Sequence, residues 1–147
     1  YYARGELYYN SEKYEKALSD FSEVIKINGK HDQAYAGRGD IYYMLEKYEK
    51  AISDYTKAIK INSKHDIAYI NRGNSYYSIE KYDKALADYT QAIKINSMNA
   101  EPYVNRATLY YGMGQTKKAE SDIKRALEIE PENEAALELK SKIKGMK

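Results

Sequence analysis

Residues 13–46 read KYEKALSDFSEVIKINGKHDQAYAGRGDIYYMLE and are followed without a gap by residues 47–80, KYEKAISDYTKAIKINSKHDIAYINRGNSYYSIE. These two stretches share 21 of 34 residues. A third copy, KYDKALADYTQAIKINSMNAEPYVNRATLYYGMG, occupies 81–114, and a more divergent fourth copy begins at residue 115. A fixed period of this length is typical of repeat architectures, in which each copy is one structural unit.

Each copy contains two apolar patterns with helical spacing. The residues of the first pattern lie on one helix face and are Tyr69, Arg72, Gly73 and Tyr76. Those of the second pattern are Ala51, Tyr55, Ala58 and Ile59. Polar residues such as Asn62 and Ser63 separate the patterns. The sequence therefore predicts an all-α chain of about nine helices in antiparallel pairs, each pair burying its apolar face against its neighbours.

The chain resembles the tetratricopeptide repeat (TPR) family. The family pattern is an aromatic residue, Gly and Tyr on the first helix, then Ala, an aromatic residue and Ala on the second. The copies supply Tyr35, Gly39, Tyr42, Ala51, Tyr55 and Ala58; then Tyr69, Gly73, Tyr76, Ala85, Tyr89 and Ala92; then Tyr103, Ala107, Tyr110, Ala119, Ile123 and Ala126, with Pro131 at the family's proline site. The resemblance implies a right-handed α-solenoid.

In the frame of that family the whole chain, 1–147, is one array. It divides into a partial repeat (1–31), three full repeats (32–65, 66–99 and 100–133) and a C-terminal capping helix (134–147). The opening YYARGELYYNSE looks like the tail of one more copy, with no initial Met and no signal-peptide layout. We therefore expect the sequence to be a fragment of a longer chain.

The composition excludes several classes of protein. The net charge is +2, with acidic and basic residues interspersed, so no basic stripe indicates a nucleic-acid partner. No apolar run is long enough for membrane insertion. There is no cysteine, so the redox compartment stays open. We expect a soluble chain and slightly favour the cytoplasm.

Short motifs that suggest chemistry have simpler interpretations here. Arg38–Asp40 reads RGD but falls in the middle of a predicted helix, and Gly112–Gly114 lacks the strand of a dinucleotide-binding loop. His31 and His65 are copies of one turn position without a further metal ligand nearby in the pattern. No nucleophile lies beside a patterned base. We therefore expect no catalytic residue, no metal site and no cofactor, and we predict that this is not an enzyme.

Small residues and charges recur at fixed places in the repeat. We expect the small residues of the first helices to face alanines of the second helices, which are Ala17, Ala51, Ala85 and Ala119. The small residues are Gly5, Gly39, Gly73 and Ala107. The arginines stand where the family usually has Leu, and are Arg4, Arg38, Arg72 and Arg106. Aspartates recur at the same period on the second helices, at Asp20, Asp54, Asp88 and Asp122. The two sets predict a ladder of Arg–Asp ion pairs, with the arginine side chains packed on tyrosine rings. The alternative is that each Arg extends into solvent.

In the family, the first helices line a concave groove that holds an extended peptide or a partner helix. The resemblance implies the same groove here. The second face of the predicted first helices then supplies the candidate binding residues Glu6, Tyr9, Asp40, Tyr43, Ile70, Asn71, Asn74, Tyr77, Asn105, Thr108 and Tyr111. Tyrosines suit a recognition surface because they combine rigid area with a polar tip. The alternative is that these rings only pack between neighbouring first helices.

Two groove chemistries of the family can be compared with this chain. The carboxylate clamp that binds chaperone tails would fall on Ala36, Asp40, Asn71, Glu101 and Asn105. Only Asn71 fits, so clamp binding is disfavoured. An asparagine ladder that holds a peptide backbone is matched at Asn71 and Asn105 and missed at Ala3 and Gly37.

The favoured function is a protein–protein interaction module, an adaptor or scaffold. The expected partner is a protein or peptide with apolar or aromatic anchors, and basic ones to meet Glu6, Asp40 and Glu101. The alternative is a substrate-recruiting or regulatory arm of a larger enzyme with its catalytic domain outside this fragment. RNA binding, as in the related pentatricopeptide class with its 35-residue period, is disfavoured by the strict spacing of 34 and the near-neutral charge.

Overall fold

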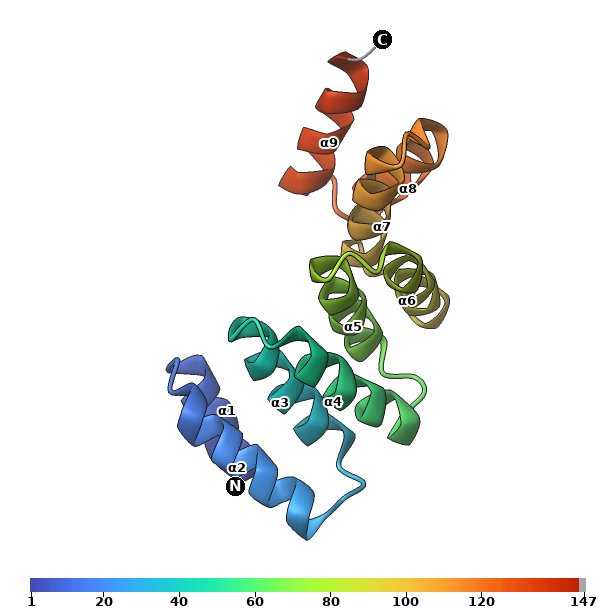
Figure 1. Ribbon diagram of the computed structural model, residues 1–147. Helices are drawn as coiled ribbons and strands as arrows, with labels where there is room; N and C mark the ends of the chain where they lie inside the picture. Colours follow the sequence, from blue (N-terminus) through green and yellow to red (C-terminus); the bar gives the residue numbers. More distant parts are fainter. Residues whose placement is uncertain (146–147) are drawn as a thin grey trace.

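The computed structural model of the protein describes residues 1–145 and is built from α-helices alone over that range (Figure 1). The helices are α1 (Tyr2–Asn10), α2 (Tyr14–Ile27), α3 (Asp32–Met44), α4 (Tyr48–Ile61), α5 (Asp66–Ser78), α6 (Tyr82–Ile95), α7 (Glu101–Gly112), α8 (Thr116–Ile129) and α9 (Glu134–Gly145). The predicted all-α class with about nine helices is confirmed. The last two residues of the predicted capping helix lie outside the described residues.

The helices form antiparallel pairs that stack in chain order, from blue α1 and α2 to red α9 in Figure 1. Within a repeat the first and second helices pack together, and each second helix also packs against the first helix of the next repeat. Neighbouring first helices touch as well, as α3 and α5 do. The first helices therefore form one continuous side of the solenoid.

The same turn joins the two helices of every repeat. One residue in each turn has a positive φ: 56° at Glu12, 56° at Glu46, 60° at Glu80 and 71° at Gly114. The next residue then donates its N–H to a tyrosine carbonyl of the preceding helix, as Lys81 does to Tyr76 at 2.8 Å. This bond satisfies a carbonyl left over at the helix end. A left-handed residue is strained when it is not glycine.

The turns between repeats give the two histidines a structural role. Nδ1 of His31 accepts a hydrogen bond from the N–H of Ala34 at 3.1 Å, and Nδ1 of His65 accepts one from Ala68 at 3.3 Å. Each histidine thus caps the N-terminus of a first helix, where backbone N–H groups have no partner within the helix. The 34-residue spacing of the histidines therefore reflects a repeated helix cap.

The glycines at the small-residue place of the first helices lie nearest to an aromatic ring of the second helix, a contact that the sequence prediction did not include. A Cβ atom built on Gly39 would lie 2.8 Å from Cε1 of Tyr55, and one on Gly73 would lie 2.7 Å from Cε1 of Tyr89. The nearest atoms are thus those of an aromatic ring one turn beyond the expected alanine. The ring fills the space between the helices, and only a residue without a side chain leaves room for it.

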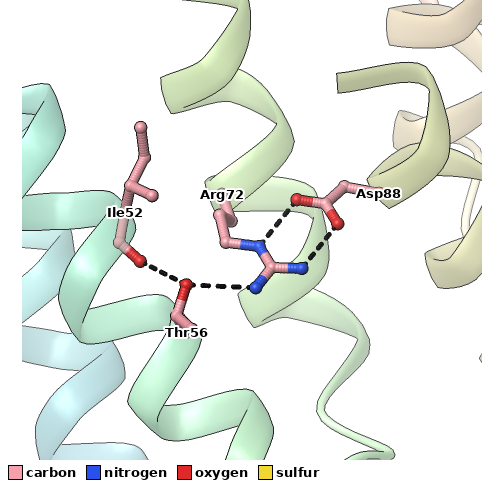
Figure 2. A network of polar contacts seen from close by, with 4 residues as sticks. All are labelled: Ile52, Thr56, Arg72 and Asp88. Carbon is pink, nitrogen blue, oxygen red and sulfur yellow. Dashed lines mark hydrogen bonds and ion pairs between the residues drawn. The ribbon is translucent and has the colours of Figure 1, made fainter. Parts of the chain in front are cut away.

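The predicted ion-pair ladder is present in all four repeats. In Figure 2, Nε and Nη2 of Arg72 donate to the two carboxylate oxygens of Asp88 at 2.8 and 2.7 Å, and Nη1 donates to Thr56 Oγ1 at 3.1 Å. Thr56 donates in turn to the carbonyl of Ile52. Arg72 on α5 therefore links the second helix of its own repeat, α6, to that of the repeat before, α4.

The arginines do not extend freely into solvent inside the array. The Arg72 side chain is 16 % exposed and Asp88 is 7 % exposed. The guanidinium lies 5.5 Å from the Tyr69 ring centre and 5.9 Å from that of Tyr76. Arg4, in the first repeat, makes the same bidentate pair with Asp20 but is 56 % exposed. The ladder is thus most enclosed where helices flank it on both sides.

Candidate functional site

Two neighbouring hollows lie along the first helices. The first, of about 210 Å³, is lined by Tyr9, Asp40, Tyr43, Met44, Tyr55, Asn71 and Asn74. The second, of about 310 Å³, is lined by Tyr43, Asn74, Tyr77, Tyr89, Glu101, Asn105 and Thr108. Tyr43 and Asn74 belong to both, so the hollows follow one another along α3, α5 and α7 as parts of one groove.

A polar triad forms the floor of the first hollow. Tyr55 donates its hydroxyl to Asp40 Oδ1 at 2.7 Å, and Asn71 donates Nδ2 to the same oxygen at 2.9 Å. The triad joins three helices, because Asp40 lies on α3, Tyr55 on α4 and Asn71 on α5. Burial and the nearby carboxylate raise the pKa of Tyr55, so its hydroxyl keeps the proton that it donates.

The second hollow has an equivalent triad one repeat later. Tyr89 donates to Asn74 Oδ1 at 2.7 Å, and Asn105 donates Nδ2 to that oxygen at 3.0 Å. The geometry is the same, but the central acceptor is an amide instead of a carboxylate. The two hollows therefore differ in charge at equivalent places.

The carboxyl group of Asp40 is held in an unfavourable place for a charge. Burial raises its pKa, while the hydrogen bonds from Tyr55 and Asn71 and the field of His65 act in the opposite direction. Desolvation is the larger effect, so the ionised form of Asp40 lacks part of the stabilisation that water would give. A cationic group placed in the first hollow would supply it.

The groove tyrosines are only partly covered. Each of three groove tyrosines, Tyr9, Tyr43 and Tyr77, contacts a tyrosine ring at the start of the second helix of its repeat. The ring centroids of Tyr43 and Tyr48 are 5.5 Å apart, and those of Tyr77 and Tyr82 are 5.6 Å apart. Tyr77 remains 44 % exposed. Each ring is thus braced by a neighbour, and Tyr77 keeps exposed surface beside the second hollow.

The hollows bring together most of the predicted groove residues. Those that line one or both are Tyr9, Asp40, Tyr43, Asn71, Asn74, Tyr77, Asn105 and Thr108. Glu6 and Tyr111 lie outside these linings. Glu6 is exposed and accepts a hydrogen bond from Tyr2 at 2.7 Å, and Tyr111 is partly buried.

Ile70 corrects the sequence prediction. Its side chain is 1 % exposed, so it belongs to the core and offers no surface to a ligand. Val104, the equivalent residue of the next repeat, is 7 % exposed. A branched apolar side chain gains about 1.5–3 kcal/mol from burial. At this place the two helices therefore pack inward, and the neighbouring polar residues Asn71 and Asn105 line the hollows instead.

The structure adds groove residues that the pattern did not identify. Tyr55 and Tyr89 looked like core aromatics, and their rings are buried, but their hydroxyls reach the groove triads. A signal was present in the repeat: Phe21 and Ile123, which stand at the same place, occur where the following first helix has Gly37 and Leu139 in place of Asn71 and Asn105. The tyrosine and the asparagine of the triad thus occur together or are absent together, whereas the central place is polar in all four repeats.

The asparagine amides have protein partners in this groove. Asn71 and Asn105 each donate Nδ2 to the preceding repeat. The expected asparagine ladder for a peptide backbone stays a prediction, and a role in linking adjacent repeats is now established by these two hydrogen bonds.

Comparison with protein families matches the chain at nearly every repeat. Models described as tetratricopeptide repeat match residues 1–31, 32–65 and 100–133, and one described as TPR repeat matches residues 73–114. The chain belongs to the tetratricopeptide repeat family. Interaction with other proteins is the function typical of this family, whose members are generally not enzymes. A search of curated proteins finds no significant match.

Solved TPR structures resemble the chain in shape. A crystal structure of MamA has a TM-score of 0.84 at 25 % identity, covering 88 % of this chain and 76 % of that one. The TPR domain of Arabidopsis OM64 has a TM-score of 0.76 at 27 % identity, covering 79 % and 96 %. The first TPR of Spaghetti (RPAP3), solved with the HSP90 peptide SRMEEVD, has a TM-score of 0.75 at 26 % identity, covering 78 % and 91 %.

Within residues 1–145, no helix is long and apolar enough to cross a membrane.

Proposed function

We propose that this TPR chain is an adaptor or scaffold that binds an extended segment of a partner protein along the first helices. The observation that carries the proposal is the pair of consecutive hollows that share Tyr43 and Asn74. An extended chain advances about 3.3 Å per residue, so a short peptide can place side chains in both hollows. The partly covered tyrosines supply rigid contact area beside polar groups.

The first hollow favours a basic side chain. Tyr55 and Asn71 both bind Oδ1 of Asp40, and no hydrogen bond within residues 1–145 uses Oδ2. A Lys or Arg of the partner can therefore donate to Oδ2. A charge-assisted bond of this kind is stronger than a neutral one, and here it offsets the desolvation of the carboxylate.

The second hollow favours an uncharged apolar or aromatic side chain beside Asn74, since its one carboxylate, that of Glu101, belongs to an exposed residue. Its central acceptor, Asn74, is neutral and already receives two hydrogen bonds. Tyr77 offers an exposed ring at its edge. We therefore expect the partner segment to carry a basic side chain for the first hollow. An apolar or aromatic side chain for the second hollow should be separated from it by the distance between equivalent places of adjacent repeats.

An acidic tail suits this groove poorly. The RPAP3 domain was solved with an acidic peptide, SRMEEVD. In the present chain Asp40 lines the first hollow and Glu101 lines the second. Like charges brought together in a partly desolvated groove repel each other, so we infer a different ligand preference from that of the RPAP3 domain.

A random peptide library displayed on phage and selected on the purified chain tests the proposal. We expect enrichment of peptides with one Lys or Arg and an apolar or aromatic residue at a fixed separation. The variant Asp40→Asn/Asn74→Asp moves the carboxylate by one repeat, so the preferred position of the basic residue should move along the peptide by the same step.

A second variant tests whether the groove is the site. Tyr43→Ala/Tyr77→Ala should weaken binding of a selected peptide at least tenfold. A matched control is Ile27→Ala/Met98→Ala, which removes two apolar side chains that are 69 % and 65 % exposed outside the hollows. Circular dichroism establishes that both variants are folded. Selection of acidic tails, or equal binding by the two variants, would contradict the proposed groove.

A further inference from the structure

The first hollow of the groove contains a single charged side chain. Among the residues that line it, only Asp40 carries a charge. No ion pair within residues 1–145 involves Asp40. The field of His65 reaches the carboxylate, but His65 caps α5 through Nδ1 and does not line the hollow. A cation that enters the hollow therefore meets one carboxylate and no cation of the lining.

The two oxygens of the Asp40 carboxylate are not equivalent. Oδ1 accepts a hydrogen bond from the hydroxyl of Tyr55 at 2.7 Å and another from Nδ2 of Asn71 at 2.9 Å. These two contacts use both lone-pair sites of Oδ1. Oδ2 receives no hydrogen bond from the described part of the chain. The carboxylate therefore offers one oxygen to an incoming group instead of two.

The Arg–Asp ladder of the same chain shows how arginine uses a carboxylate. In each of its four pairs, Nε and Nη2 of the arginine donate to the two separate oxygens of the aspartate, at 2.7 to 2.9 Å. A guanidinium gains most from two parallel contacts of this kind, because its N–H groups are fixed in a planar fork. At Asp40 the second contact of the fork is blocked by Tyr55 and Asn71.

The remaining acceptors of the hollow suit an ammonium group. No hydrogen bond between residues 1 and 145 uses the hydroxyl of Tyr9 on α1 or that of Tyr43 on α3. Burial and then the field of Asp40 raise the pKa of Tyr9, so its hydroxyl stays neutral. A lysine ammonium can turn its three donors toward acceptors on different helices, whereas a guanidinium has five donors in fixed directions. Donors that stay unpaired in a partly buried site weaken binding.

We infer that the first hollow is a lysine site that discriminates against arginine. Asp40 supplies the charge, and Tyr55 and Asn71 determine the specificity because they occupy Oδ1. The inference rests on the proposed peptide-binding function and specifies its partner as a segment whose basic anchor is a lysine. The second hollow has the same triad around a neutral amide, that of Asn74, so it does not repeat the lysine site.

The experiment compares three versions of one peptide. A fluorescein-labelled peptide selected from the phage library is made with Lys, Arg or norleucine at the basic anchor, and fluorescence anisotropy measures its binding to the whole chain. We expect the Lys version to bind at least tenfold more tightly than the Arg version, and the norleucine version to bind most weakly. Tyr55→Phe/Asn71→Ala makes both oxygens of Asp40 available, so the Arg version should gain affinity and the Lys-to-Arg ratio should fall at least tenfold.

The chain itself indicates that this variant folds, because Phe21 and Gly37 stand at the places of Tyr55 and Asn71 one repeat earlier. Circular dichroism checks it. The matched control is Tyr89→Phe/Asn105→Ala, which removes the same two donors from Asn74. Whatever this control does to the affinity itself, it should leave the Lys-to-Arg ratio unchanged.

The outcomes separate the lysine site from the groove. An Arg version that binds the wild type as tightly as the Lys version overturns the inference, and so does a ratio that Tyr55→Phe/Asn71→Ala leaves unchanged. In either case the proposed function stands if Tyr43→Ala/Tyr77→Ala still weakens binding. If the library yields no peptide, or if the norleucine version binds as tightly as the Lys version, the proposed basic anchor and the lysine site both fail.

Discussion

The backbone of Gly73 lies directly against the ring of Tyr89, so closely that a Cβ atom on Gly73 would be 2.7 Å from Cε1 and 2.9 Å from Cδ1 of the ring. Tyr89 cannot easily move away, because it is 2 % exposed and its hydroxyl is bound to Asn74. In repeat 100–133 both partners differ: Ala107 stands in place of the glycine and Ile123 in place of the ring. The larger residue on the first helix therefore occurs with the smaller side chain on the second helix.

Gly73→Ala should lower the free energy of unfolding by about 1–3 kcal/mol, as overpacking of a core does. The gain in helix propensity, about 1 kcal/mol, acts in the opposite direction and is smaller than the clash with a held ring. Urea unfolding followed by circular dichroism measures the change.

The matched control adds the partner found in the last full repeat. In a Tyr89→Ile background, Gly73→Ala should be neutral or stabilising, because the smaller side chain leaves room for the methyl group. If Gly73→Ala costs the same in both backgrounds, the ring is not the reason for the glycine.

Arg72→Ala should destabilise the chain by about 3 kcal/mol, because it leaves the carboxylate of Asp88 buried without its cation. The Asp88 side chain is 7 % exposed, and α6, which carries it, packs against both α5 and α7. Arg4→Ala is the control. Arg4 is 56 % exposed, so water can replace its guanidinium beside Asp20, and we expect less than half the loss.

Thermal and urea unfolding of the two variants give the comparison, and Arg72→Leu/Asp88→Leu extends it. Removal of both charges should restore most of the stability lost in Arg72→Ala, since a buried pair replaced by apolar residues is often neutral. Equal losses for Arg4→Ala and Arg72→Ala would mean that burial does not determine the importance of the pair.

The ladder shows which features could be predicted from the sequence. The period of 34 places Arg72 and Asp88 at fixed positions on two helices that pack together, so charge pairing could be predicted, but only the structure excludes the alternative in which Arg72 extends into solvent. The helix pairs follow from the same regularity, because one copy cannot bury its apolar faces without the next.

The groove was predicted less completely, for a physical reason. Helical spacing puts Ile70 on the same face as Asn74 and Tyr77, but how closely neighbouring first helices pack decides where that face becomes accessible. The hydroxyl of Tyr55 was missed because a buried ring can still carry a polar tip to the surface. The covariation of the Tyr55 and Asn71 places among the repeats is the signal that identifies it.

Glu80→Gly should raise the free energy of unfolding by about 0.5–1 kcal/mol, because Glu80 has a φ of 60° and glycine adopts this left-handed conformation without a steric penalty. Gly114, at the same place in the last turn, has a φ of 71°. Gly114→Ala should therefore lower the free energy of unfolding. Differential scanning calorimetry measures both, and a loss of stability in Glu80→Gly would show that its side chain matters more than its backbone.

Asp40→Asn should remove a pH dependence that comes from the groove. Burial raises the pKa of Asp40 in the folded chain, so the folded state holds this proton more tightly than the unfolded state does. The resulting stabilisation is fully present below the ordinary Asp pKa of about 3.9 and is lost as the pH rises through the folded-state pKa. Asparagine at residue 40 keeps a neutral acceptor at every pH, as Asn74 does in the second triad.

The measurement is the difference in unfolding free energy between Asp40→Asn and wild type from pH 4 to pH 8. We expect a difference near its minimum at pH 4 that grows in favour of Asp40→Asn toward neutral pH. Asn74→Asp is the matched control and should introduce the same trend with the opposite sign. All other carboxyl groups are common to the compared chains, so their titration cancels. A difference that stays constant with pH would show that the Asp40 carboxylate is as well solvated in the groove as in the unfolded chain, and the expected preference for a basic partner would then lose its main support.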